Sequence, residues 1–558
     1  MQSSEAASPP QRLVQGLLEG WRRLAQRPLT IAFYASLILI VALEVFAAPH
    51  RIHRWIADSL SHIDGGWRVL NGQRPHVDFF SGIGPVTYLT VALGMIISRS
   101  GAALDYGVAV AGAVFGIWAW SLFRNRVEAP AALLLALFVT LCASSPHMMG
   151  SRPDMLTAEG VYNRLGYALL IIVFVECLRS SPSEGLLGGV SSGVICVLTF
   201  FLKPSFFMAA VALICGSFLF DDRRRRKRIL GMAMGFSASA LIMLAYLRFD
   251  VAAVLLDLRT MAAARLEMKL GDIRVDIGPR SWLKSALAES PDLIGLLLVS
   301  LIVSMTPRAP RVWRVLDAWW PMAAAAAIFA LEIVFRSGNA MQDSLPLVGT
   351  FALLLVSEMY AGWSRAPQQQ RQAYSALCGF GLLCGLVMFV PEPLRDFSSV
   401  VYSSVESALN RPIAARFEPA HLGALVTLEP NPDWDEPANG KALVDEVNDG
   451  IRLLRRASAQ TESVFTLNYF NPFPFALLRK PAPGAGSWLG PSFFSEKHPL
   501  PLDRLFGRVD LMMVPRHPEP SVNTRFLMRV VLPYVETHFH PAAESDYWIM
   551  YRRNGLTP

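Results

Sequence analysis

Long apolar segments, separated by short polar ones, fill the first 390 of the 558 residues of this chain. A helix of roughly 20 apolar residues crosses the hydrocarbon core of a bilayer, and tilt or local thinning accommodates other lengths. Such segments recur at residues 29–48, 106–123, 129–147, 161–178, 186–201, 204–220, 229–247, 293–305 with its flanks, 318–335, 345–361 and 374–391. The pattern predicts an α-helical polytopic membrane region of about eleven spans over residues 29–391, after a polar tail at residues 1–28.

A further apolar run, residues 85–97, has 13 residues and begins with Pro85. It is either a twelfth span or a helix lying in the interface, and the loop charges decide, because Lys and Arg are enriched in cytoplasmic loops. With eleven spans and a cytoplasmic N-terminus, the cytoplasmic segments hold 18 Lys and Arg in 72 residues, against 15 in 128 on the other side. A twelfth span would export the basic cluster at 223–228. We therefore predict eleven spans, a cytoplasmic N-terminus and an exported C-terminal domain.

The remaining residues, 392–558, return to an ordinary density of charged residues, Pro and Asn. Apolar runs favour strands and amphipathic spacing favours helices. The predicted strands are 463–467, 509–514 and 547–551, and the predicted helices are 441–457 and 524–539. Alternating strands and helices are typical of an α/β layer domain. The predicted fold class is thus an α-helical membrane protein with a small C-terminal α/β domain.

The composition supports the membrane assignment. Apolar residues make up 53% of the chain and charged residues 17%, whereas soluble globular chains carry about a quarter charged residues. The net charge of +7 comes with arginines clustered between apolar segments, a pattern that orients membrane proteins rather than one that binds nucleic acid. All six cysteines fall in apolar segments and show no metal-ligand spacing. We expect a multi-pass protein of the cell inner membrane without a nucleic-acid partner.

The predicted loops are uneven in length. Cytoplasmic connections are short, whereas the exported loops at 49–105 and 248–292 and the tail are long. Functional residues concentrate on loops that a rigid scaffold positions. The exported face is therefore where we expect the chemistry, and the helical spacing from Val251 to Leu270 predicts an interfacial helix there.

The most informative exported segment, residues 62–85, reads HIDGGWRVLNGQRPHVDFFSGIGP. Its two acids, Asp64 and Asp78, are fourteen residues apart, with Gly, Pro and aromatic residues between them. An acid near the membrane surface can act as general base on a hydroxyl group that meets a lipid-linked partner. The spacing alone favours two acids that cap short helices or turns.

This segment resembles the membrane glycosyltransferases of the GT-C class. The resemblance rests on an acid in the first exported loop, a Leu-Asn-Gly turn, Pro-X-X-Asp-Phe and a Gly-Pro before the next apolar helix. It is strongest over Asp64 to Pro85 and weaker through about residue 360. Enzymes of this class use polyprenyl-phosphate-linked sugars as donors, and they include protein mannosyltransferases, oligosaccharyltransferases and lipid A aminoarabinose transferases.

The resemblance implies that Asp64 is the catalytic base of an inverting transfer. Many members have Glu after this Asp, whereas this chain has Gly65, so Asp78 or Asp154 is expected to supply the second carboxylate. Asp154 lies in the next exported loop, where some relatives place an acid that positions substrate or binds a metal. A divalent metal, Mg²⁺ or Mn²⁺, is therefore a candidate cofactor. Capping of the following helix is an equally good explanation of Asp154.

Two cations lie within or between the apolar runs. Lys203 separates two of them, and Arg164 lies about one turn inside another. Buried charges are costly and usually face a cavity or a partner, and the donor phosphate is a partner that favours cationic hydrogen-bond donors. Snorkelling to the interface is the alternative for both residues. Arg280, in the long loop, is a further candidate contact for a lipid phosphate.

These observations give one leading hypothesis and one alternative of a different class. The leading hypothesis is a membrane glycosyltransferase that moves a sugar from a polyprenyl-phosphate donor to a glycan, lipid or protein acceptor on the exported face. The alternative is a transporter or a non-catalytic component of envelope polysaccharide assembly, whose buried charges form a path. The acids lie in loops rather than at mid-span, which favours the enzyme.

Overall fold

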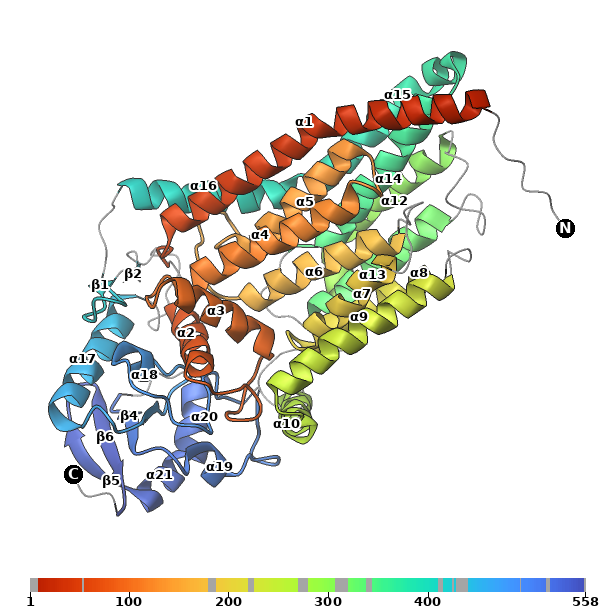
Figure 1. Ribbon diagram of the computed structural model, residues 1–558. Coiled ribbons are helices and arrows are strands. Elements are labelled where there is room, and N and C mark those ends of the chain that lie inside the picture. Colours follow the sequence, from red (N-terminus) through yellow and green to blue (C-terminus); the bar gives the residue numbers. More distant parts are fainter. Residues whose placement is uncertain are drawn as a thin grey trace.

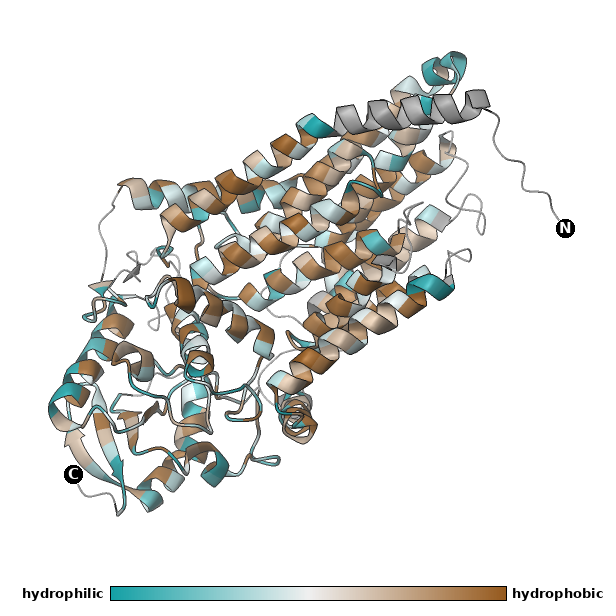
Figure 2. Ribbon diagram, viewed as in Figure 1, coloured by the Kyte–Doolittle hydropathy of each residue, from teal (hydrophilic) through white to brown (hydrophobic). Residues whose placement is uncertain are grey.

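The computed structural model describes residues 9–52, 55–178, 187–218, 225–268, 279–306, 320–337, 344–409, 415–423, 426–427, 440–491, 493–517 and 522–555. A bundle of long helices occupies one part of the molecule, and a small α/β domain lies at one end of this bundle (Figure 1). We call that end of the bundle the domain end. Hydrophobic residues dominate the bundle helices, and hydrophilic segments gather on the α/β domain (Figure 2).

Each of the eleven apolar runs contains a helix of the bundle. These helices are α1 (Pro9–Ala47), α4 (Ala103–Phe123), α5 (Ala129–Ser144), α6 (Val161–Leu178), α7 (Leu187–Phe200), α8 (Pro204–Ser217), α9 (Arg225–Tyr246), α12 (Ser290–Met305), α13 (Trp320–Ser337), α14 (Pro346–Arg365) and α15 (Gln368–Phe389). Among the described residues, six helices are long and apolar enough to span a bilayer: α1, α4, α6, α9, α14 and α15. A bent pair of helices, α11 (Pro279–Ala288) and α12, adds a seventh. The helical polytopic class is confirmed, and the count of eleven spans stays a prediction.

Three further helices lie at the domain end. These are α2 (Ile56–Leu70), α3 (Pro85–Ile97) and α10 (Val251–Met268). The 13 residues of α3 cover about 20 Å at 1.5 Å per residue, which is short of a roughly 30 Å hydrocarbon core. Helix α3 packs between α2 and α4. The run at 85–97 is thus a short helix beside the first loop, as its length suggests.

Helix α16 (Pro391–Leu409) follows the bundle and packs against α1 and α5. The boundary expected at residue 392 therefore falls at the start of a helix that lies along the bundle. The α/β domain follows it in the chain, with its compact part over residues 440–555.

The domain contains a four-stranded sheet in the order β3-β4-β6-β5. Its elements are α17 (Lys441–Ala457), β3 (Val464–Thr466), α18 (Phe473–Ala476), α19 (Leu502–Phe506), β4 (Leu511–Pro515), α20 (Val522–Val530), α21 (Leu532–His538), β5 (Phe539–Glu544) and β6 (Trp548–Arg553), and a separate pair, β1 (Ala415–Arg416) and β2 (Val426–Thr427), precedes them. The β3–β4 pair is parallel and the other two pairs are antiparallel. The predicted α/β character is confirmed. The single helix expected at 524–539 is divided into α20 and α21, because Pro533 favours a new helix start.

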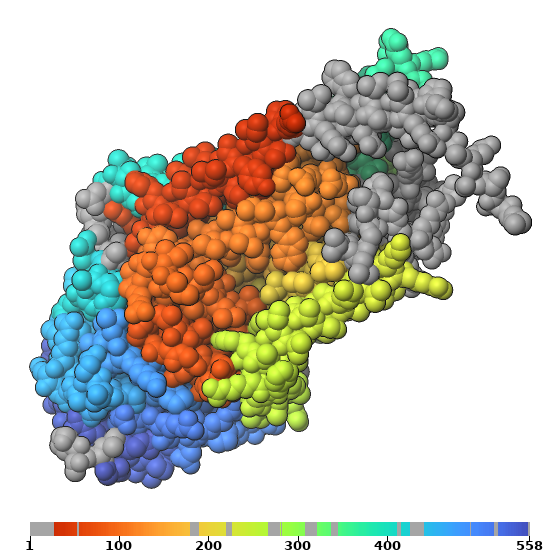
Figure 3. Space-filling model, in the orientation of Figure 1, coloured from red at the N-terminus to blue at the C-terminus, as the bar shows by residue number. Residues whose placement is uncertain are grey.

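The first loop holds the domain against the bundle. The backbone N–H of Phe80 donates to the carbonyl of Gly484 at 2.7 Å, and the N–H of Gly484 donates to that of Asp78 at 2.8 Å. Helix α10 also contacts the domain, since Arg504 pairs with the buried Asp257 of α10 at 3.3 Å. In Figure 3 the α9–α10 segment lies against the first loop and the domain. Any chemistry at the domain end therefore takes place between three parts of the chain.

Candidate functional site

Asp64 lies on α2 and is completely buried. Its Oδ2 accepts hydrogen bonds from Arg68 Nε at 2.9 Å and from Ser487 Oγ at 3.0 Å, and its Oδ1 accepts one from Asn471 Nδ2 at 3.1 Å. Arg68 also donates to the carbonyl of Ala482 at 2.7 Å. Both oxygens of the carboxylate are therefore engaged in holding the domain on α2, and no surface is left for a substrate hydroxyl.

The other two predicted acids hold local turns. The Oδ2 of Asp78 accepts a hydrogen bond from the backbone N–H of Arg74 at 2.8 Å, which closes the turn after α2. Asp154 is half-exposed and pairs with the exposed Arg152 at 2.5 Å. Exposed pairs of this kind contribute little to stability. The structure thus places the three acids at the domain end without bringing their carboxylates into one site.

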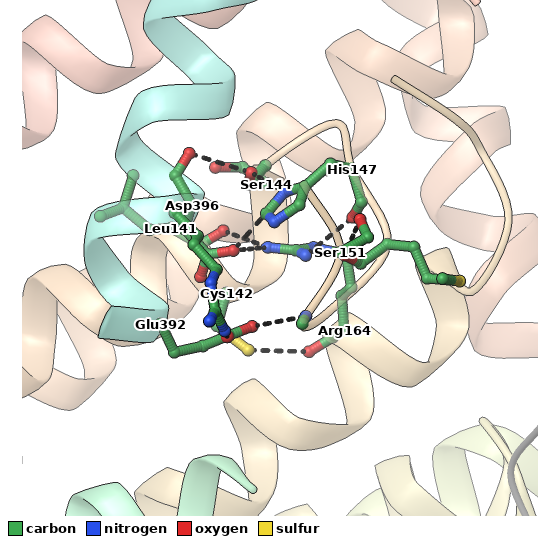
Figure 4. A network of polar contacts seen from close by, with 12 residues as sticks. Leu141, Cys142, Ser144, His147, Ser151, Arg164, Glu392 and Asp396 are labelled. Carbon is green, nitrogen blue, oxygen red and sulfur yellow. Dashed lines mark hydrogen bonds and ion pairs between the residues drawn. The ribbon is translucent and has the colours of Figure 1, made fainter. Parts of the chain in front are cut away.

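Arg164 is buried inside a polar network that joins α6 to α16 (Figure 4). Its guanidinium pairs with Asp396 at 2.6 Å and donates to the carbonyls of His147 and Leu141. Glu392 accepts from the backbone N–H of Gly150 in the same network. Arg164, which was predicted to bind the donor phosphate, therefore forms its ion pair with a carboxylate of the protein itself.

Arg280 is exposed at the start of α11, a helix whose neighbours are α12 and α13. Arg280 is not among the described residues that contact Lys203 or line the pocket beside it. Among the residues that the structure describes, no group of three or more His, Cys, Asp or Glu side chains fits a metal ion. The divalent metal therefore stays a prediction.

Lys203 occupies the turn between α7 and α8. Its Nζ lies 4.9 Å from the centre of the Tyr162 ring and donates to Asn163 Oδ1 at 3.3 Å. Burial, with a contribution from the positive charge of Arg265, lowers the pKa of Lys203 to about 7. An amine with a pKa of about 7 is partly neutral near neutral pH. It takes up a proton when an anion binds beside it, because the anion favours the charged form.

Lys203 also lines a pocket of about 320 Å³, its open mouth included. Much of the wall is apolar, and it comes from the end of α7 and from α10; its members are Phe200, Phe201, Val254, Leu258 and Met261. His76 and the Gly82–Gly84 segment of the first loop complete it. A cation beside an apolar wall at the end of a membrane bundle suits an anionic lipid headgroup with its chain.

Asp58 is the acid that the sequence analysis did not single out. It lies in the first turn of α2 and keeps part of its surface accessible. Its Oδ1 accepts a hydrogen bond from Trp488 Nε1 at 3.1 Å. Burial raises the pKa of Asp58 to about 6, although the Trp488 hydrogen bond opposes this rise. A carboxylate with a pKa near the working pH is suited to general base catalysis.

Tyr162 connects Asp58 with Lys203. The ammonium of Lys203 lies over its ring, and both Asp58 and Arg265 lie close enough to act electrostatically on its hydroxyl. From the domain side, burial and then the negative charge of Asp58 raise the pKa of Tyr469. A carboxylate, two cations and aromatic rings from α2, α6, α10 and the domain are thus near enough to influence one another.

One sequence signal points to Asp58. It follows the first span by about ten residues, in Ile56-Ala57-Asp58-Ser59-Leu60, and it opens an amphipathic helix. The pattern of residues 62–85 drew attention to Asp64, six residues later. The contact that distinguishes the two acids comes from Trp488, 430 residues from Asp58 along the chain. The sequence around Asp58 gives no sign of this contact.

No family model and no curated protein matches the chain. Among solved structures, the chain is similar to the crystal structure of ArnT from Cupriavidus metallidurans bound to undecaprenyl phosphate. The match covers 94% of this chain and 97% of that chain, at 12% sequence identity and a TM-score of 0.43. At this identity and TM-score, the roles of individual residues depend on the geometry of this chain alone.

Proposed function

We propose that this protein is an integral membrane glycosyltransferase. It transfers a sugar from a polyprenyl-phosphate donor to a hydroxyl acceptor at the domain end, on the exported side of the membrane. The observation that supports this function is that Asp58 and Lys203 both lie near Tyr162, and that Lys203 also lines a pocket with an apolar wall. The resemblance of residues 62–85 to the GT-C class favours the same chemistry.

The cations serve the donor. Lys203 and Arg265 neutralise the phosphate, and the apolar wall receives the first isoprene units of the lipid. Because burial keeps the pKa of Lys203 at about 7, an arriving phosphate stabilises its protonated form. The same two charges then stabilise the polyprenyl phosphate that departs when the bond to the sugar breaks.

Asp58 serves the acceptor. Its carboxylate takes the proton of the acceptor hydroxyl while the hydroxyl oxygen attacks the anomeric carbon from the face opposite the phosphate. The bond from that carbon to the phosphate oxygen breaks, its electron pair leaves with the polyprenyl phosphate, and the configuration inverts. His62 stays neutral beside this centre, because burial lowers its pKa to about 3, although the nearby backbone carbonyl of Ala158 opposes the shift.

This proposal assigns other work to several residues of the first hypothesis. Asp64 holds the domain on α2, and Arg164 holds α16 on α6. Asp78 and Asp154 stabilise turns. The general base moves from Asp64 to Asp58 because, of these two acids of α2, Asp58 keeps an accessible carboxylate.

The test is transfer by the purified full-length protein with a panel of polyprenyl-phosphate sugars. We expect one donor to be consumed in the presence of an acceptor. Transfer needs ionised Asp58 and protonated Lys203, so kcat/KM should be highest between about pH 6 and pH 7 and fall on both sides. Donor binding without turnover across the panel would contradict the enzyme and favour a non-catalytic role.

A further inference from the structure

Trp488 belongs to the C-terminal domain but lies among the side chains of the first loop. It is 4% exposed, and its indole N–H points to Asp58 Oδ1. The edge of the His62 ring meets it with centroids 4.7 Å apart, and the Tyr88 ring stacks on it at 6.2 Å. Three contacts from two other helices thus fix the ring plane in which the N–H lies.

The backbone that carries Trp488 is fixed as well. The N–H of Trp488 donates to the carbonyl of Tyr469 at 2.8 Å, and the residue adopts the left-handed region with a φ of 62°. Such a conformation is uncommon for a bulky residue and persists where the surroundings hold it. The preceding residue, Ser487, donates to Asp64 at 3.0 Å. The Asp64 network therefore holds the segment that presents Trp488.

We infer that Trp488 is a positioning residue of the transfer reaction, through which the C-terminal domain orients the carboxylate of Asp58 and keeps it ionised. This inference rests on the proposed function. The indole hydrogen bond holds Oδ1, which leaves Oδ2 to accept the proton of the acceptor. The reaction centre is then complete only when the domain is docked on α2.

Several ionisable groups face Asp58 from the elements around it. They are His62 on α2, Glu159 before α6, Tyr162 on α6 and Tyr469 in the domain, and Arg265 of α10 acts electrostatically on Tyr162. Neutral His62 and the two tyrosines add no charge near neutral pH. The Trp488 N–H is the hydrogen-bond donor that lowers the pKa of Asp58 against the effect of burial.

The experiment compares the pH dependence of single-turnover transfer in the wild type and in Trp488→Phe, which removes the N–H and keeps an aromatic ring. We expect the acid limb to move up by about one pH unit, because a lost hydrogen bond to a charged group favours the protonated form. Relative to the wild type at the same pH, transfer by Trp488→Phe should be reduced at pH 6 and approach the wild-type rate toward pH 8. Trp548→Phe is the matched control: Trp548 is also buried in the domain, and its indole donates to the carbonyl of Glu446. It should leave the limb in place.

A purely structural role for Trp488 predicts equal loss of transfer at every pH, and that result would overturn the inference. If Trp488→Phe does not fold, 3-benzothienylalanine at position 488 keeps the bicyclic shape and replaces N–H by sulfur, with the same expected shift. An unchanged acid limb in that variant also overturns it. The proposed function fails separately, when the wild type binds donors of the panel but transfers no sugar from any of them.

Discussion

Asp58 and Asp64 are two carboxylates on one helix with different surroundings. Asp64 receives three hydrogen bonds, one of them from the guanidinium of Arg68, and has no accessible surface. Asp58 receives one from Trp488 and stays partly accessible. Ion pairing and hydrogen bonding favour the charged form, and burial disfavours it. The surroundings of Asp64 therefore suit a structural role, and those of Asp58 suit a general base.

A prediction for Lys203 follows from its position beside the pocket. Lys203→Ala removes a charge-assisted contact with the donor phosphate and should weaken donor affinity by about tenfold or more, with the fold intact. Arg280→Ala, an exposed cation of the same general region of the chain, is the control and should bind like the wild type. Donor titration at pH 6.5 measures both. Equal affinities of Lys203→Ala and the wild type would return Lys203 to the snorkelling explanation.

Residue types alone gave Lys203 and Arg164 the same predicted partner, the donor phosphate; this stays a prediction for Lys203, whereas the structure pairs Arg164 with a carboxylate of the protein. Both are cations next to apolar runs, which signals a buried partner of opposite charge. For Arg164 the partner is Asp396, which is 232 residues away on α16. A partner at that distance in the sequence is set by packing of whole helices. The sequence therefore predicts that a partner exists and leaves its identity open.

At the scale of elements, apolar length and periodicity predicted most of the fold. All eleven apolar runs contain helices, and α10 and α17 lie where the periodicity places them. Helix α2 was described only as a loop with capping acids, because its sequence, Ile56–Leu70, mixes polar and glycine residues with the apolar ones. Strand β5 also escaped prediction. Its exposed residues lack the alternation that marks a strand.

How the helices meet was not predictable from periodicity. Helices α7 and α9 approach closely where Gly193 faces the carbonyl of Met232, and a Cβ on Gly193 would lie 2.2 Å from that oxygen. Gly235 approaches the carbonyl of Val190 in the same way. Small residues permit such crossings in membranes. A single sequence shows the glycines but not which helix each of them contacts. The packing of α7, whose end contributes to the wall of the Lys203 pocket, is therefore known only from the structure.

At the scale of the whole molecule, the proposed site lies where the bundle, the first loop and the C-terminal domain meet. Asp58 and Lys203 come from the membrane half, and Trp488 and Tyr469 come from the domain. The same junction holds Asp64 with Asn471, and Asp257 with Arg504. A domain that adds part of the reaction centre cannot be exchanged for an unrelated one without loss of transfer.

The orientation of the whole molecule gives a further prediction. The density of Lys and Arg predicts that the C-terminal domain lies outside the cytoplasm. Reporters fused after Pro391 should signal an exported location, and reporters within residues 85–105 should signal the same side. Because the site lies at the domain end, this is also the side where donor and acceptor meet. A cytoplasmic signal from the tail would contradict the eleven-span topology and the exported site.

The most direct measurement of the central claim is single-turnover sugar transfer by Asp58→Asn and Asp64→Asn, each with its donor affinity and thermal stability. Asp58→Asn removes the base and should lower transfer a hundredfold or more, with donor affinity and stability unchanged. Asp64→Asn leaves the buried Arg68 without its counter-charge and should lower stability by about 3 kcal/mol, while the folded fraction still transfers sugar. Asp154→Asn, an exposed acid, serves as control. Near-wild-type transfer by Asp58→Asn together with lost transfer by a folded Asp64→Asn would contradict this account and restore Asp64 as the base.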